Sequence, residues 1–226
     1  MQKAWRFLKR LFLWLFILQL VYIIFCKWIN PPVTITQIGS LVQGYGLHRD
    51  YVDFNEMSPE IKLAVMASED QLFPEHNGFD IKAIKKALKY NKKHVAKVRG
   101  GSTISQQVAK NVFLWQGKSM VRKGMEVYFT FMIENIWSKK RILQTYLNVA
   151  EMGKGIFGVQ AAAKYYFKKD AKNLTRAEAA MIAAALPNPK VYTVKPMSNY
   201  IAKRYPEIMH QMDNLEGDDA IDELTK

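Results

Sequence analysis

The strongest constraint on this sequence is an apolar run without a charged residue at positions 11–26 of the 226-residue chain. As a helix, the run and its extension to residue 29 would span roughly 24–28 Å, close to the ~30 Å hydrocarbon core of a bilayer. Four basic residues and no acidic one precede it within positions 1–10. Because basic flanks remain in the cytoplasm, we expect a cytoplasmic segment at 1–10, a transmembrane anchor at 11–29 and the remaining chain beyond the membrane.

A cleavable signal peptide and a buried core helix are the alternatives for this run. Signal-peptide cleavage needs small residues near the end of the apolar run, whereas this run ends in Ile24-Phe25-Cys26. A buried core helix gives no reason for the basic residues on its flank. We therefore expect an integral anchor.

Composition narrows the choice of partner. The chain is 49% hydrophobic and 23% charged, which excludes a wholly disordered protein. Its single cysteine excludes a disulfide framework, and its four histidines lack zinc-site spacing, so no metal site is predicted. The formal net charge of +13 indicates an anionic partner: nucleic acid, a membrane surface or a phosphorylated substrate. A body outside the cytoplasm favours the last two, and no nucleic-acid partner is expected.

Beyond the anchor the pattern is mostly helical. Residues 30–57 are expected to be a linker that starts with two prolines and holds a short strand at 33–36. Residues 58–206 are expected to form one mainly α domain, because apolar residues recur at helical spacings. Its expected helices are 59–69, 80–94, 102–115, 119–137, 139–150, 158–168 and 176–186. Residues 207–226 carry seven acidic residues and one basic residue, and we expect a helix end followed by a loose acidic tail.

Glu69 and Asp70 close the first predicted helix and lead into a loop that contains Phe73, His76 and Gly78. Adjacent acids, an aromatic ring and an imidazole on one loop are typical of the edge of an active site, because loops on rigid scaffolds commonly carry function. The alternative is a solvated helix end in which His76 and Gly78 serve as caps. Composition alone leaves both open.

A second candidate stretch, residues 99–111, reads RGGSTISQQVAKN. Its glycine pair permits a sharp turn, and the hydroxyl residues that follow can cap a helix. On that helix Thr103, Gln107 and Lys110 share one face. Hydroxyl, amide and ammonium groups suit sugar hydroxyls and phosphate oxygens, although an ordinary solvated face is the alternative. The stretch lacks the ending of a P-loop.

A third candidate group consists of Lys118, Arg122 and Glu126, which lie four residues apart on one predicted helix face. The neighbours of Glu126 are strongly apolar, which favours a partly buried, functional carboxylate. The alternative is a surface ion pair with Arg122, worth only ~0.3–0.5 kcal/mol.

Two further patterns are weaker indications of function. Residues 153–158 satisfy G-x-G-x-x-G, but a helix rather than a strand is expected before them, so no dinucleotide site is predicted. Residues 82–99 hold eight basic residues and no acidic one. Beyond a membrane anchor, an amphipathic basic helix favours contact with anionic lipid.

Taken together, the motifs resemble those of the peptidoglycan glycosyltransferases, glycosyltransferase family 51. The family patterns E-D-x-x-F-x-x-H-x-G, G-G-S-T-[IL]-x-Q-Q-x-x-K-N and R-K-x-x-E are met at 69–78, 100–111 and 122–126, and S-K-x-x-I-L-x-x-Y-L-N follows at 138–148. The resemblance covers about residues 55–190. It departs from the family at Lys118, where members often carry Arg, and nothing beyond residue 206 matches.

The resemblance implies a lysozyme-like α-helical glycosyltransferase domain that polymerises lipid II onto a lipid-linked glycan chain. Glu69 would be the general base on the acceptor 4-hydroxyl, and cations would neutralise the leaving undecaprenyl pyrophosphate as an inverting reaction forms the β-1,4 bond. Glu126 would be a second catalytic carboxylate that orients these groups. The implied substrate-binding residues are Asp70, Phe73, His76, Thr103, Gln106, Gln107, Lys110, Asn111, Lys118, Arg122 and Lys123.

The resemblance also implies a setting: the bacterial inner membrane, a single pass, a periplasmic catalytic domain, and cell-wall synthesis or division proteins as partners. It allows a divalent cation such as Mg²⁺ on the pyrophosphate, although the sequence shows no dedicated ligand set. S-x-x-K and K-T-G are absent, so no transpeptidase activity is expected. The rival functions are a lytic transglycosylase, which cleaves peptidoglycan, and a non-enzymatic membrane-tethered scaffold for anionic polymers.

Overall fold

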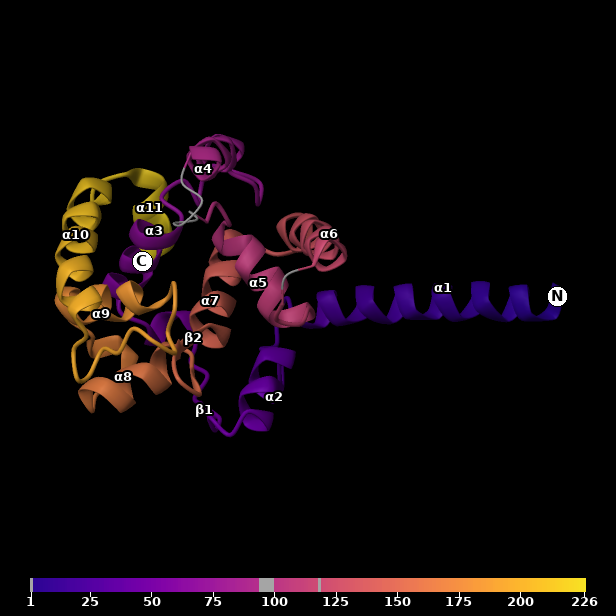
Figure 1. Cartoon of the computed structure of the whole chain (residues 1–226), viewed down its shortest axis with the longest axis horizontal. Coiled ribbons are helices and arrows are strands. Elements are labelled where there is room, and N and C mark those ends of the chain that lie inside the picture. The colour runs from indigo at the N-terminus through magenta and orange to yellow at the C-terminus, as the bar shows by residue number, and fades with distance from the viewer. Residues whose placement is uncertain (1, 94–99, 118) are drawn as a thin grey trace.

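The computed structural model describes residues 2–93, 100–117 and 119–226 (Figure 1). Over these residues the chain forms a helical body from which one long helix, α1, projects (Figure 1). The helices are α1 (Gln2–Phe25), α2 (Ile35–Val42), α3 (Pro59–Glu69), α4 (Ile81–Lys93), α5 (Ile104–Phe113), α6 (Met120–Ile136), α7 (Lys139–Val149), α8 (Val159–Phe167), α9 (Arg176–Ala185), α10 (Asn199–Leu215) and α11 (Asp219–Thr225). The predicted mainly α fold is confirmed.

Hydroxyl residues begin the helices of the body. The side chains of Ser58, Ser138 and Ser198 accept hydrogen bonds from the third residue of the helix that each precedes. Thr103 and Thr175 do the same within capping boxes closed by a Gln or Glu three residues later. These caps satisfy backbone N–H groups that a helix start otherwise leaves unpaired. The helices predicted from the sequence for α3 and for α5 to α9 are confirmed, and these caps mark the starts of α3, α5, α7 and α9.

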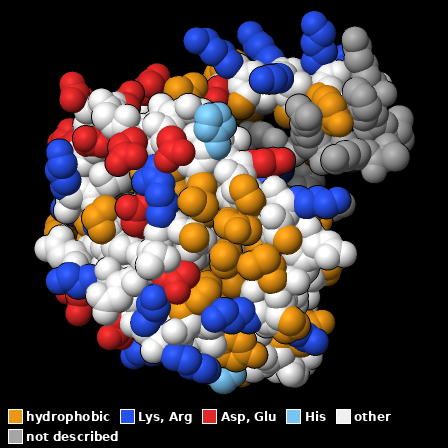
Figure 2. All heavy atoms as spheres, turned by 90° about the vertical axis from the view of Figure 1, so that its left-hand side faces the viewer, with side chains coloured by type: hydrophobic (Ala, Val, Ile, Leu, Met, Phe, Trp, Pro, Cys, Tyr) orange, Lys and Arg blue, Asp and Glu red, His pale blue; other side chains and the backbone are white. Residues whose placement is uncertain are grey.

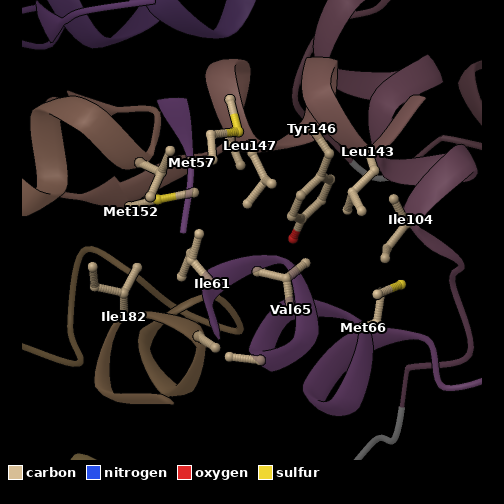
Figure 3. Close-up of a cluster of buried hydrophobic side chains, with 14 of the residues drawn as sticks. Met57, Ile61, Val65, Met66, Ile104, Leu143, Tyr146, Leu147, Met152 and Ile182 are labelled. Atoms are coloured by element: carbon tan, nitrogen blue, oxygen red, sulfur yellow. The ribbon is translucent and has the colours of Figure 1, made fainter. Parts of the chain in front are cut away.

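Helix α3 lies at the centre of the body. Its residues from Ile61 to Ala67 are all buried, so no face of the helix is left to solvent. Figure 3 shows Ile61 and Val65 of α3 between Ile182 of α9 and Tyr146 of α7. Helices α9, α10 and α11 pack on α3, while α5 packs on α6 and α7. Glu69 ends α3, and the core therefore fixes its position.

A small sheet of three short strands occupies one end of the body. Strand β3 (Ile156–Phe157) lies between β1 (His48–Arg49), which is parallel to it, and β2 (Glu151–Gly153), which is antiparallel. The G-x-G-x-x-G pattern therefore forms the β2–β3 hairpin and the start of α8. Gly155 has a φ of +72°, and a Cβ there would collide with the carbonyl of Tyr45. These glycines serve the turn and its close packing.

The short strand predicted at residues 33–36 is wrong. Thr34 instead caps α2: its Oγ1 accepts from the Gln37 N–H, and the Gln37 side chain accepts from the Thr34 N–H. The alternation of apolar residues and Thr at 33–36 resembles a strand, but Thr is also a favourable residue at the start of a helix, as in this capping box.

For residues 207–226 the predicted helix end is confirmed, but the loose tail predicted after it is wrong. Helix α10 continues to Leu215, and α11 follows after a turn at Gly217. Ile221 and Leu224 of α11 are buried against the body, and the buried ammonium of Lys62 on α3 donates to the carbonyl oxygen of Thr225 at 3.2 Å. Figure 2 shows that acidic side chains gather at one end of the face that carries α10. The segment is acidic outside and apolar inside, a pattern of packed helices.

Helix α1 is the one described helix that is long and apolar enough to cross a membrane, and its large side chains are mostly exposed. Its last turn is held by the body. The Trp137 indole N–H donates to the carbonyl of Ile23 at 2.9 Å, and the Arg141 guanidinium donates twice to the carbonyl of Cys26, at 2.8 and 3.0 Å. These donors satisfy carbonyls that a helix end leaves unpaired.

Candidate active site

The carboxylate of Glu69 faces the start of α5. The Gln107 Nε2 donates to Glu69 Oε2 at 2.7 Å. Burial raises the pKa of Glu69, and the Gln107 hydrogen bond and the charges of Arg204 and Lys110 act against that rise. A carboxyl with a raised pKa takes up a proton more readily than an exposed one, as a general base must.

Asp70 and His76 hold each other. The Asp70 carboxylate accepts from the Ile104 N–H at 2.9 Å and lies 2.9 Å from His76 Nε2. His76 Nδ1 in turn accepts from the Gly78 N–H at 3.1 Å, so its Nε2 carries the proton that is donated to Asp70. The pair joins the end of α3 to the start of α5, and the structure places both in the framework of the site.

Three other predicted substrate-binding residues, Phe73, Thr103 and Gln106, also have structural roles. Phe73 is fully buried. Thr103 caps α5 and donates to the Gly78 carbonyl at 2.7 Å, while the Gln106 side chain closes the capping box. These hydrogen bonds shape the backbone of the site, and Thr103 also lines the first cavity described below.

A cluster of charges occupies the junction of α5 and α6. Glu126 is only 3% exposed. Its carboxylate accepts from Arg122 Nη1 at 2.6 Å and from the Lys123 ammonium. Burial lowers the pKa of Lys110, whereas the charges of Glu126 and Glu69 raise it. The Lys110 ammonium therefore interacts electrostatically with both Glu126 and Glu69.

Two cavities of about 320 Å³ each lie at this site, one lined by Glu69 and the other by Gln107, and the Glu69–Gln107 hydrogen bond links their linings. The first is lined by Glu69, Asp70, Thr103 and the glycine turn before α5, with Arg204 and Gln211 of α10 opposite. The second is lined by residues of α5 and α7 and of the segment after α9, among them Gln107, Lys110, Asn111, Tyr146, Glu151 and Lys190. Glu69 therefore lines the first cavity and Lys110 the second.

The structure also brings in residues that the sequence did not single out. Arg204 lies on α10, beyond the motifs, and its charge acts on Glu69. Burial raises the pKa of Glu151, whose carboxylate lies 3.6 Å from Lys190. These residues reach the site through the tertiary fold.

Two predictions fall partly beyond what the structure describes. Lys118 lies outside the described residues, as do residues 94–99 of the predicted basic helix. Within the described part of that helix, Lys82, Lys85, Lys86 and Lys89 of α4 are exposed or half-buried around the apolar Ile84. Among the described residues no three His, Cys, Asp or Glu side chains group as metal ligands.

Comparison with known proteins places the fold and this site in one family. Residues 35–213 match the transglycosylase family. The biosynthetic peptidoglycan transglycosylase of Mannheimia succiniciproducens is 56% identical over 171 residues, which cover 76% of this chain and 70% of that protein. Those of Haemophilus influenzae and Yersinia pestis are 53% and 51% identical, covering 79% and 84% of this chain and 74% and 80% of theirs. The chain belongs to the transglycosylase family, and its domain has the lysozyme-like α fold that the resemblance implied.

Proposed function

We propose that this protein is a peptidoglycan glycosyltransferase of cell-wall synthesis that polymerises lipid II, with Glu69 as its general base. The relatives named biosynthetic peptidoglycan transglycosylases support the activity. The observation that carries the choice of base is the position of the Glu69 carboxylate. It lines one cavity and accepts a hydrogen bond from Gln107, which lines the other, while burial raises its pKa and the charge of Lys110 acts on it.

The chemistry assigned to Glu69 is a single proton transfer. Its ionised carboxylate takes the proton of the acceptor 4-hydroxyl as that oxygen attacks the anomeric carbon of the donor. The bond from that carbon to the pyrophosphate oxygen breaks, and undecaprenyl pyrophosphate leaves with the electron pair. Attack opposite an α-linked leaving group gives the β-1,4 bond, so the reaction is inverting.

The leaving pyrophosphate is stable enough to depart without a general acid if cations balance its charge. Lys110, Arg122 and Lys123 supply such cations, and Glu126 holds the last two in place. Because Glu126 already accepts hydrogen bonds from two cations, it orients them and transfers no proton. Where a divalent cation accompanies the pyrophosphate, it adds to the same neutralisation, and this chain's own residues do the positioning.

The membrane setting follows from α1 and α4. We place α1 across the inner membrane with its basic N-terminal flank in the cytoplasm and the catalytic domain in the periplasm. The lysines of α4 suit contact with anionic lipid headgroups. In this arrangement the active site lies near the bilayer surface, where the lipid-linked substrates are held.

The test is polymerisation of purified lipid II by the full chain in detergent or vesicles. Wild-type protein should give glycan polymer that moenomycin, a donor mimic in this family, blocks, while Glu69→Gln should give none and retain its circular dichroism and Tm. Polymer at the wild-type rate from Glu69→Gln would refute the assigned base. Incubation with intact sacculi distinguishes the lytic alternative, because release of anhydro-muropeptides without polymer formation would show cleavage.

A further inference from the structure

We propose that Tyr146 is a positioning residue for the catalytic base, acting on Glu69 through the side-chain amide of Gln107. This inference rests on the proposed function, since it takes Glu69 to be the base. It adds a residue that acts on the carboxylate through a second side chain, by setting which end of the Gln107 amide faces Glu69.

Three helices contribute to this chain of hydrogen bonds. Tyr146 of α7 is 1% exposed, and its hydroxyl points from α7 toward α3 (Figure 3). The hydroxyl donates to Gln107 Oε1 on α5 at 3.4 Å. Gln107 Nε2 donates to Glu69 Oε2 at the end of α3 at 2.7 Å. The amide thus joins the buried phenol to the carboxylate.

The direction of these bonds is fixed by chemistry. Burial raises the pKa of Tyr146 well above its ordinary value, and the charges of Glu69 and Asp70 add to the rise, so the phenol keeps its proton. A buried hydroxyl needs an acceptor, and the amide oxygen of Gln107 can only accept. Tyr146 therefore holds the oxygen of Gln107 on its own side and leaves the NH₂ group for Glu69.

The consequence for the base is electrostatic. An N–H that donates to a carboxylate favours its ionised form, whereas an amide oxygen in the same place would repel it. Without the Tyr146 hydroxyl the amide can rotate and lose its donor role. The ionised fraction of Glu69 would then fall at any given pH near its pKa.

The other charged and titratable groups that face Glu69 stay the same in this comparison. They are Asp70 at the end of α3, Lys110 of α5, and Tyr200 and Arg204 of α10. Because Tyr146→Phe alters none of them, a change in the titration of Glu69 would report on the amide.

The first experiment is the pH dependence of kcat/KM for lipid II polymerisation by the full chain. Tyr146→Phe keeps the ring and removes the hydroxyl, and it should move the acidic limb to higher pH by about one unit. The matched control is Tyr166→Phe. Tyr166 is also buried, and its hydroxyl donates at 3.2 Å to the Met152 carbonyl, away from Glu69. Its acidic limb should match that of the wild type, and equal limbs in all three proteins would overturn the proposal.

The second experiment is a double-mutant cycle with Gln107→Met, which keeps the length of the side chain and removes its hydrogen bonds. Gln107→Met alone should shift the acidic limb in the same direction, and adding Tyr146→Phe should shift it no further. If Tyr146→Phe shifts the limb equally in both backgrounds, Tyr146 does not act through Gln107. Glu69→Gln is measured alongside. Polymer from that variant would refute Glu69 as the base, whereas unchanged acidic limbs in the Tyr146 variants would refute only the role of Tyr146.

Discussion

Arg122 and Glu126 form a buried ion pair in which Nη1 of Arg122 lies 2.6 Å from Oε2 of Glu126. The same carboxylate binds Lys123. The pair is four residues apart on α6, as on many exposed helices, but exposed pairs of this kind contribute only ~0.3–0.5 kcal/mol. Burial makes this one different, because removal of one partner leaves the other charge uncompensated away from water.

Glu126→Gln should therefore lower the free energy of unfolding by about 3 kcal/mol and reduce kcat/KM for polymerisation at least about tenfold. The cations would lose the group that orients them toward the pyrophosphate. Chemical denaturation and steady-state polymerisation measure the two effects. Asp50→Asn, which breaks the exposed ion pair of Asp50 with Lys164, is the control and should cost below about 1 kcal/mol. A Glu126→Gln variant that behaves like the control would contradict the assigned role.

Lys110 gives a prediction about the alkaline limb of activity. Its pKa is lowered by burial, so its ammonium loses its charge at a lower pH than that of an exposed lysine. If that charge neutralises the leaving group, kcat/KM should fall as the pH rises through this lowered pKa. Lys110→Arg should extend the activity to higher pH, since guanidinium stays charged. Lys110→Ala should lose about 100-fold at neutral pH. An unchanged alkaline limb in Lys110→Arg would show that another group titrates there.

Helices α3 and α5 to α9 could be predicted from the sequence, in part because several of their starts carry local signals. Ser58 before Pro59, and Thr175 before Glu178, act within three residues of chain and leave a pattern that can be read directly. The tail could not be read in this way. Its acidic surface residues outnumber Ile221 and Leu224, and only contact with α3 shows that these two form a buried face.

The candidate site was predictable in part for a similar reason. Motif positions stand out in a sequence whether they bind a substrate or support the local structure: Asp70 and Thr103, predicted to bind substrate, line the first cavity and also make structural hydrogen bonds. Arg204 of α10 and Tyr146 of α7 interact with Glu69 although they lie far from it in the sequence. A local sequence pattern cannot show that such distant residues are neighbours. Tertiary structure alone brings them to Glu69.

Lys62 predicts how stability responds to pH. The side chain is 2% exposed, and burial and the charge of Lys140 lower its pKa to about 8. In the unfolded chain Lys62 has the ordinary lysine pKa of about 10.4. Between about pH 8 and pH 10.4 the unfolded state therefore binds more protons than the folded state, so the free energy of unfolding increases as the pH rises. Relative to Lys62→Met, wild-type protein should gain about 1–3 kcal/mol between pH 8 and 10.

Thermal or chemical unfolding in detergent at several pH values measures this gain. Lys203→Met removes a lysine from the exposed surface of α10 and controls for the change in net charge. If the difference between wild type and Lys62→Met does not vary with pH, Lys62 is not the group that titrates. Proteolysis of α11 should accelerate in Lys62→Met, because the hydrogen bond to Thr225 is lost.

Arg141 predicts that the anchor and the catalytic body are mechanically joined. Its guanidinium is 8% exposed and binds the Cys26 carbonyl twice and Asn30 Oδ1 once, at 2.9 Å. Hydrogen bonds that involve a charged group each contribute about 1.5–3 kcal/mol, so Arg141→Leu should release the last turn of α1. In lipid nanodiscs, amide exchange at residues 22–30 should therefore increase. Polymerisation should fall several-fold, because the active site is no longer held at a fixed distance from the bilayer.

Two variants make this prediction specific. Arg141→Lys should not restore the wild-type behaviour, since an ammonium cannot reproduce the planar fork that binds Cys26 and Asn30 together. Arg176→Leu breaks another arginine network, with Glu60, Asp213 and Glu216, far along the chain from the anchor contacts. It should lower overall stability without faster exchange at residues 22–30. Equal exchange in the Arg141 and Arg176 variants would mean that Arg141 contributes general stability, and that the anchor is held by Trp137 and the aromatic packing around it.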